Sequence, residues 1–478
     1  MLRARTILAR VACAGLLALP TILAFSAGGF FEGARTRAGI AVWIAVAVAL
    51  LAGAHLFPAS RPARVSVAGL LLLAVWTTVA IAWTPLRDPA LTDAVAVWLY
   101  AGYLLLAVAL LRGAALRLVE PALAGGVVVI TGYALATRLL PSIVPSAHSV
   151  RAGGRLDQPL TYWNALGLVA AIGLVLLLRL ASDERRSIRL RALAAGLTPI
   201  PGLALYLTFS RGSLAAAAAG VAVLLALSPG RRAVMTTAVC LVAVAVAAGL
   251  TSRFAAVDSL SGSASSQRTE GLAVLAITLA CCAAAQLGAR AVARGAADRL
   301  YLGGGRALAL VAVAAALGVG AIAVGRADAP ATTSDLPKDR SRLATLRSNR
   351  IDYWKVAFDG FSDRPFAGQG TNGFASLWLK KRPISETVQD AHSLYIETAV
   401  ELGVIGLVLL GMFLGGALAS AARVARDPVA IGALAAASAF LVHAGLDWDW
   451  EMPTVTLFFI ALVACVLAVA DEHQRGTA

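Results

Sequence analysis

Long apolar segments, separated by short polar loops, recur along nearly the whole chain. After a first segment that reaches about Phe25, they lie at about 38–57, 64–84, 92–111, 118–140, 159–179, 190–209, 211–228, 232–250, 270–288, 307–325, 394–421, 429–446 and 452–470. Each is close to the ~20 residues that an α-helix needs to cross a bilayer. The pattern predicts an all-α, polytopic membrane protein with about fourteen transmembrane helices.

One long polar interval, 326–393, breaks this pattern. Residues 1–325 before it hold predicted helices 1 to 11, and residues 394–478 hold predicted helices 12 to 14 and a short tail. Aromatic residues recur within the interval, so we expect it to form a loop with two or three short amphipathic helices that pack together.

Composition and charge agree with a membrane protein. Of the 478 residues, 59% are hydrophobic and 14% charged, which is more apolar surface than a soluble core could bury. The net charge of +15 would suggest nucleic-acid binding in a soluble protein, but much of it lies in short loops between apolar segments. Because Lys and Arg favour the cytoplasmic ends of such segments, we expect both termini inside, the 326–393 loop outside and no nucleic-acid partner. On this arrangement Arg35 and Arg37 lie in a short outer loop.

The five cysteines lie within apolar segments and none forms a Cys-x-x-Cys pair. This placement is typical of core residues rather than of disulfides or metal ligands. No other metal-binding cluster or phosphate-binding loop stands out, so we expect no metal and no cofactor.

An arginine lies at the junction of two apolar segments, in the sequence Ser210-Arg211-Gly212-Ser213. Placing a charge there is costly, and such a residue is a candidate functional group. Gly212 and Ser213 allow the next helix to start sharply, so its N-terminal amides and Arg211 together suit an anion. The alternative interpretation is an arginine that reaches the lipid head groups.

A second polar group of residues precedes the sixth predicted helix. It contains Arg151, Arg155 and Asn164, together with the aromatic pair Tyr162 and Trp163. An interfacial aromatic belt would explain the aromatics. The two arginines lie on the same predicted side as Arg211, and three cations gathered there favour an anionic partner such as phosphate.

Four motifs follow one another in the sequence and resemble a known family. They are Ser210-Arg211-Gly212 at a helix start, Arg350-x3-Trp354-x2-Ala357, Pro365-x2-Gly368-x-Gly370, and His392-Ser393-x-Tyr395-x5-Glu401-x-Gly403-x2-Gly406. In this order they resemble the O-antigen ligase and O-antigen polymerase family of bacterial membrane glycosyltransferases. The pattern at 154–164 is similar to a more N-terminal motif of the family. Ser393 departs from the family, in which Asn often follows the histidine.

The resemblance implies an enzyme of cell-surface polysaccharide biosynthesis in the cytoplasmic membrane. Such an enzyme transfers glycan from an undecaprenyl-diphosphate carrier to a hydroxyl of a glycan, lipid or protein acceptor at the outer membrane face, without a metal or a nucleotide-sugar donor. By motif position, Arg211 and Arg350, with Arg155 as a further candidate, would bind the diphosphate, and His392 would act near the acceptor.

The chemistry of the reaction independently favours these residue types. Departure of a diphosphate develops negative charge that fixed guanidinium groups can stabilise. The attacking hydroxyl needs a proton acceptor with a pKa near neutrality, and His392 would contribute about a hundred- to ten-thousandfold. The alternative interpretation of His392 is a cap for the helix that begins near Ser393.

The last predicted outer loop holds Asp447-Trp448-Asp449-Trp450-Glu451, preceded by His443. We expect these acids either to orient His392 or to contact the glycan, with Asp449 as the residue to test. A belt of interfacial aromatics with solvated acids would give the same pattern.

Two other functions stay open. A transporter or flippase of an anionic or lipid-linked substrate would also combine many helices with membrane arginines, although internal repeats are expected there. A scaffold for envelope assembly would need no histidine and arginine group. Within the enzyme interpretation, the motifs do not separate polymerase, ligase and protein glycosyltransferase, which differ in their acceptor.

Overall fold

The computed structural model describes residues 2–146, 151–295 and 348–476, and no strand occurs in these ranges. The all-α prediction is confirmed there. The α-helices are α1 (Leu2–Ala24), α2 (Glu32–Leu51), α3 (Arg61–Val79), α4 (Arg87–Leu110), α5 (Leu116–Leu139), α6 (Trp163–Ser182), α7 (Ile188–Leu197), α8 (Pro199–Leu207), α9 (Arg211–Leu227), α10 (Arg231–Thr251), α11 (Ala255–Asp258), α12 (Ala264–Arg294), α14 (Arg350–Asp363), α15 (Gly373–Lys381), α16 (Leu394–Val424), α17 (Ile431–Ala444) and α18 (Pro453–Gly476). A 3-10 turn, η6 (Asp449–Glu451), lies between the last two.

The apolar segments correspond to helices of the bundle. Ten are long and apolar enough to cross a membrane, namely α2, α3, α4, α5, α6, α7 with α8, α10, α12, α16 and α18. Three shorter apolar helices are residues 10–24 of α1, α9 and α17. Each overlaps a predicted segment, and the remaining predicted segment, 307–325, lies outside the described residues. The structure therefore supports a multi-pass membrane protein, while the number fourteen and the orientation stay predictions.

Helix α2 is displaced from its predicted range of 38–57. It begins at Glu32 and ends at Leu51, because Gly53 follows in the left-handed region with φ 79°. Arg35 and Arg37 therefore lie inside the helix, so their assignment to a loop was wrong, while the side of the membrane stays a prediction. The Arg35 side chain is 2% exposed, and its guanidinium donates to the carbonyls of Phe30 at 2.5 Å and Thr92 at 3.2 Å. These carbonyls satisfy the N–H donors, and the Asp93 carboxylate, 3.6 Å from Nη1, pairs with the buried charge.

Helix α6 begins at Trp163 rather than at the predicted residue 159. Tyr162 before it is extended, and Thr161 has φ 64°, which a helix cannot include. The residues before Trp163 therefore form a separate polar segment at the mouth of the bundle.

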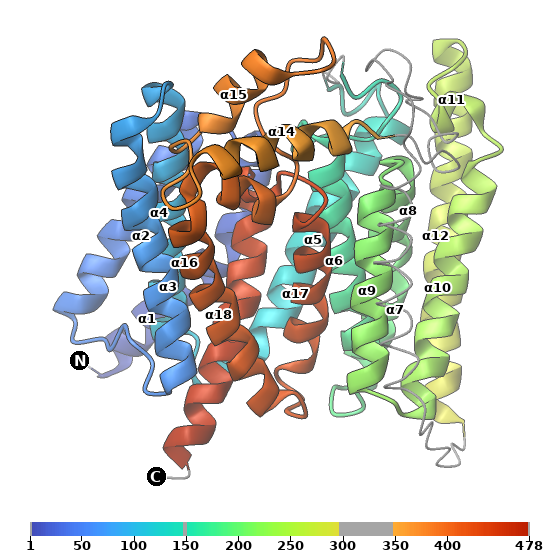
Figure 1. The fold of residues 1–478 in the computed structure, drawn as a ribbon. Coiled ribbons are helices and arrows are strands. Elements are labelled where there is room, and N and C mark those ends of the chain that lie inside the picture. The colour runs from blue at the N-terminus through green and yellow to red at the C-terminus, as the bar shows by residue number, and fades with distance from the viewer. Residues whose placement is uncertain (1, 147–150, 296–347, 477–478) are drawn as a thin grey trace.

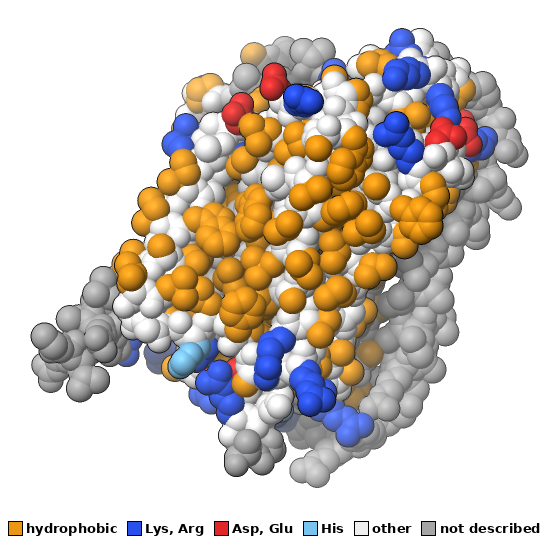
Figure 2. Space-filling view, turned by 60° about the vertical axis from the view of Figure 1, so that its left-hand side comes forward, with side chains coloured by type: hydrophobic (Ala, Val, Ile, Leu, Met, Phe, Trp, Pro, Cys, Tyr) orange, Lys and Arg blue, Asp and Glu red, His pale blue; other side chains and the backbone are white. Residues whose placement is uncertain are grey.

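The centre of the bundle is formed by α6 and α18, whose membrane-length windows are wholly buried. A helix that is apolar on all sides is expected in such a position. The peripheral helix α2 instead exposes Ile40, Ile44 and Val48 on one face. Figure 2 shows apolar side chains across the middle of one face of the molecule, with Lys and Arg near its two ends. This arrangement suits lipid along the sides and water at both ends.

Helices α14 and α15 lie across one end of the bundle, while the two termini lie toward the other end (Figure 1). The two short helices pack together through Tyr353, Phe374 and Trp378. The Trp354 indole donates to the Ala391 carbonyl at 3.0 Å, and the Trp378 indole donates to that of Glu386 at 2.8 Å. These contacts fix the segment that leads to His392.

Candidate active site

Asp447 is the centre of a group of polar side chains between the bundle and α14. Its carboxylate is 1% exposed and accepts hydrogen bonds from Tyr162 Oη at 2.7 Å, Asn164 Nδ2 at 2.6 Å, Arg350 Nη2 at 2.9 Å and the Trp448 amide at 3.0 Å. Burial alone would raise the pKa of Asp447, but the neighbouring positive charge, foremost that of Arg350, holds it below its usual value. The carboxylate is therefore ionised, and it fixes the guanidinium of Arg350.

His392 lies immediately before α16, with its backbone in the left-handed region at φ 55°. Its Nδ1 lies 3.0 Å from the Asp390 carbonyl, and its ring packs 5.2 Å from that of Tyr353. A carbonyl can only accept, so Nδ1 carries the proton and Nε2 is the acceptor in the neutral ring. Burial lowers the pKa of His392, with Arg350 adding to the effect and Asp447 opposing it. The ring is thus poised as a neutral proton acceptor beside an arginine and a carboxylate.

Arg211 is the first residue of α9, as the sequence predicts. Ser210 before it is extended, and its Oγ accepts a hydrogen bond from the Ser213 amide at 3.3 Å. This cap ends the preceding chain sharply and points the α9 N-terminus toward the same end of the bundle. A Cβ on Gly212 would lie 3.2 Å from His443 Nε2, so the first turn of α9 is packed against α17.

Arg155 and Asn164 have different hydrogen-bond partners. Asn164 belongs to the group around Asp447, whereas Arg155 is tied to its own segment. Its guanidinium lies 3.5 Å from the centre of the Trp163 ring and donates to the carbonyls of Ala152 and Arg151, each at 2.8 Å. Stacking and backbone contacts thus hold an arginine that is 5% exposed.

Asp449 is fully buried, and its Oδ2 lies 2.6 Å from His443 Nδ1. Of the three acids in this loop, Asp447 is the one whose charge influences the pKa of His392. Asp447 thus acts on His392 through its charge, which favours the protonated ring, and Asp449 contacts a different histidine. Nothing in the local sequence separates two aspartates that lie two positions apart.

No site role was predicted for His443. Asp447 was predicted only as one of the acids of its loop, and Tyr162 and Ser213 only as neighbours of Asn164 and Arg211. The available signal was the presence of ionisable and hydroxyl residues at the ends of otherwise apolar helices, which is costly unless they are paired. The partners lie far apart in the chain, so only the fold identifies them.

Two of the family-like motifs meet at one backbone joint. Within α16, Gly403 has φ 66° and ψ −164°, and a Cβ there would overlap the Phe366 carbonyl. The chain around Phe366 pairs with the unwound turn, since Gln369 N donates to Val400 O at 2.8 Å and Gly370 N donates to Glu401 O at 2.9 Å. The glycines of these motifs therefore join α16 to the α14–α15 loop and have a structural role near the site.

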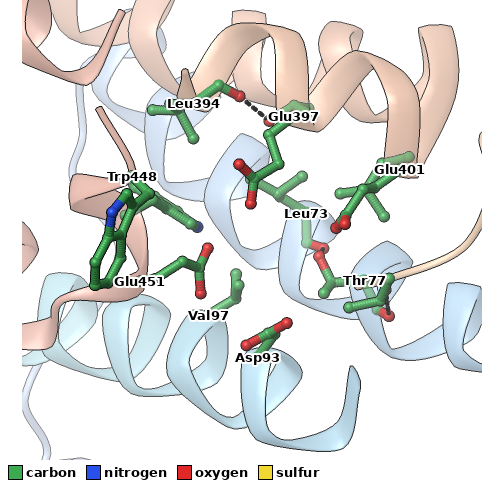
Figure 3. Close-up of a pocket in the computed structure, with 13 residues that line it drawn as sticks. Leu73, Thr77, Asp93, Val97, Leu394, Glu397, Glu401, Trp448 and Glu451 are labelled. Atoms are coloured by element: carbon green, nitrogen blue, oxygen red, sulfur yellow. Dashed lines mark hydrogen bonds between the residues drawn. The ribbon is translucent and has the colours of Figure 1, made fainter. Parts of the chain in front are cut away.

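A cavity of about 50 Å³ lies beside Trp448, the residue that follows Asp447. The carboxylates of Asp93, Glu397 and Glu451 point toward one space within it (Figure 3). Trp448 lines the cavity and also packs on Tyr162, with ring centres 4.4 Å apart. Within the described ranges, no group of three or more His, Cys, Asp or Glu side chains is placed to hold a metal ion.

Comparison with known proteins identifies part of the chain. A family model described as O-antigen ligase matches residues 194–411. The chain carries an O-antigen ligase domain. The resemblance based on the motifs is thereby confirmed over this range, and no curated protein matches the chain.

The O-antigen ligase domain contains Arg211, Arg350 and His392, whereas Asn164 and Asp447 lie outside the matched residues. Asp447 nevertheless accepts a hydrogen bond from Arg350 within the domain, and Asn164 donates one to Asp447. The site is therefore completed by residues that precede and follow the domain in the chain. The domain supports a general function in membrane glycan ligation or polymerisation, within polysaccharide biosynthesis.

Proposed function

We propose that this protein transfers a glycan from an undecaprenyl-diphosphate carrier to an acceptor hydroxyl at the outer face of the cytoplasmic membrane. The acceptor is a glycan, a lipid or a protein. The observation that carries the proposal is the arrangement of Arg350, Asp447 and His392 at the start of α14, where a fixed cation, a carboxylate and a neutral imidazole lie together. A lipid tail would enter between helices, and the glycan would extend outside.

In the proposed step, the acceptor oxygen attacks the anomeric carbon while its proton passes to His392 Nε2. The bond between the anomeric carbon and the diphosphate oxygen breaks, and the diphosphate leaves with the electron pair. Arg350 and Arg211 stabilise the charge that develops on it, at roughly 3 kcal/mol for each well-placed group. Asp447 fixes Arg350 and stabilises the imidazolium that forms on His392.

A reconstituted assay tests this proposal. Purified protein in liposomes receives a panel of undecaprenyl-diphosphate-linked glycans and acceptors, in the presence of a metal chelator. We expect transfer by the wild type and a loss in His392→Gln and Arg350→Lys, because Lys cannot form the planar contact with Asp447 and a diphosphate together. His55→Gln is the matched control, since His55 is an exposed histidine that begins no motif.

The outcomes separate the hypotheses. An absence of transfer with every donor, combined with movement of the donor across the bilayer, would support the transporter interpretation instead. Wild-type rates in His392→Gln would refute the assignment of the base while leaving the reaction itself in place.

A further inference from the structure

His443 forms a second, deeply buried histidine site at the end of α17. Its Nδ1 lies 2.6 Å from Asp449 Oδ2, and its Nε2 lies 3.0 Å from Ser213 Oγ. The three side chains are 1%, 0% and 0% exposed, respectively. An aspartate, a histidine and a serine in this order have the connectivity of a hydrolytic triad.

The surroundings of Ser213 exclude a role as nucleophile. Its Oγ also lies 2.8 Å from Ser210 Oγ and 3.1 Å from the Asn164 carbonyl. A hydroxyl that is fully buried and shared among three polar partners cannot reach a sugar carbon. The same contacts instead join three elements of the site, namely the start of α9, the start of α6 and the end of α17.

This connection is compatible with either protonation state of His443. The Asp449 carboxylate only accepts, so Nδ1 carries a proton. A neutral ring accepts the Ser213 proton at Nε2. A charged ring donates to Ser213 Oγ, whose own proton then goes to the Asn164 carbonyl. The contact between α17 and α9 is thus retained in both states.

The connection ends at two residues of the proposed site. Ser213 belongs to the capping turn in which Arg211 is the first helical residue. Through the Asn164 backbone it also reaches the residue whose side chain bonds Asp447 at 2.6 Å. We propose that Asp449, His443 and Ser213 form a positioning relay that sets Arg211 and Asn164 for the lipid diphosphate. The inference rests on the proposed function, and none of the three residues touches substrate.

Matched variants of His443 test the relay. The amide of a glutamine reaches the place of Nε2 and keeps the Ser213 contact, whereas that of an asparagine reaches the place of Nδ1 and keeps only the Asp449 contact. We expect His443→Asn and Ser213→Ala to weaken binding of undecaprenyl diphosphate about ten- to hundredfold. His443→Gln, which keeps the Ser213 contact but loses the one to Asp449, is expected to lose less affinity than His443→Asn. Thermal unfolding in detergent verifies that each variant is folded, and Ser213→Ala replaces any His443 variant that is not.

A double-mutant cycle distinguishes positioning from general loss of structure. Because part of the relay acts through Arg211, Ser213→Ala should cost less affinity in an Arg211→Ala background than in the wild type. Equal losses in both backgrounds, or equal losses in His443→Asn and His443→Gln, would overturn the relay. If undecaprenyl diphosphate binds as expected but the wild type transfers no glycan, the proposed function fails and the relay stands as part of a binding site.

Discussion

His392 and His443 lie at the same end of the bundle, yet they are held in different ways. His392 lies in a loop, and a backbone carbonyl orients its Nδ1. His443 lies in a helix, 1% exposed, and a carboxylate orients its Nδ1. No described residue bonds to His392 Nε2, whereas His443 Nε2 is bonded to Ser213.

The difference indicates that the two rings have different roles. A carbonyl fixes a ring without adding charge, so burial keeps His392 neutral and its free nitrogen can take a proton. A carboxylate and a hydroxyl use both nitrogens of His443, so that ring can hold neighbouring helices but has no nitrogen left for a substrate. The predictions below test these two roles.

The largest expected effect is that of His392→Gln. Loss of the proton acceptor should lower kcat by about a hundred- to ten-thousandfold. Because the pKa of His392 lies below its usual value of about 6.5, wild-type transfer should be constant above that pH and fall in more acidic buffer, as the ring gains a proton. Measurement of kcat from pH 5 to 8 checks this. A profile of the same shape in the residual activity of His392→Gln would contradict the assignment.

The next effect concerns the two aspartates. Asp447→Asn removes the charge that fixes Arg350 and stabilises an imidazolium at His392, so we expect about a ten- to hundredfold loss of kcat. Asp449→Asn leaves an amide oxygen that can still accept from His443 Nδ1, and its loss should be smaller. Tyr162→Phe removes one hydrogen bond to the ionised Asp447, worth about 1.5 kcal/mol, and a roughly tenfold loss is expected. A larger loss in Asp449→Asn than in Asp447→Asn would reverse the assigned roles.

These aspartates also illustrate the limits of prediction from sequence. Apolar length was enough to predict the helices, because a bilayer imposes it locally. It could not predict that Asp447 meets Asn164, 283 residues away, or that the turn at η6 directs Asp449 to His443 instead. Likewise, charge counting placed Arg35 in a loop, although it lies inside α2 and its carbonyl partners come from α4 and the chain before α2. The periodicity of apolar residues reports on local structure, so it does not predict contacts between residues that are far apart in the sequence.

The smallest expected effect separates the backbone of Asp390 from its side chain. Its carbonyl orients His392, while burial, together with the charges of Asp93 and Asp447, raises the pKa of its carboxyl to about 7. The folded state therefore binds this proton more tightly than the unfolded chain, whose carboxyl has a pKa of about 3.9. Stability should fall as the pH rises from about 4 to 7 and then level off.

Asp390→Asn cannot ionise and retains the carbonyl. It should therefore lose less stability across this pH interval, with a Tm roughly 2 °C above that of the wild type at pH 8. Transfer at pH 6, where the wild-type carboxyl is mostly protonated, should stay close to normal. Thermal unfolding at pH 4.5 and 8 and a transfer assay at pH 6 check both parts. A strong loss of transfer at pH 6 would mean that the Asp390 side chain orients His392, and the two histidines would then both depend on a carboxylate.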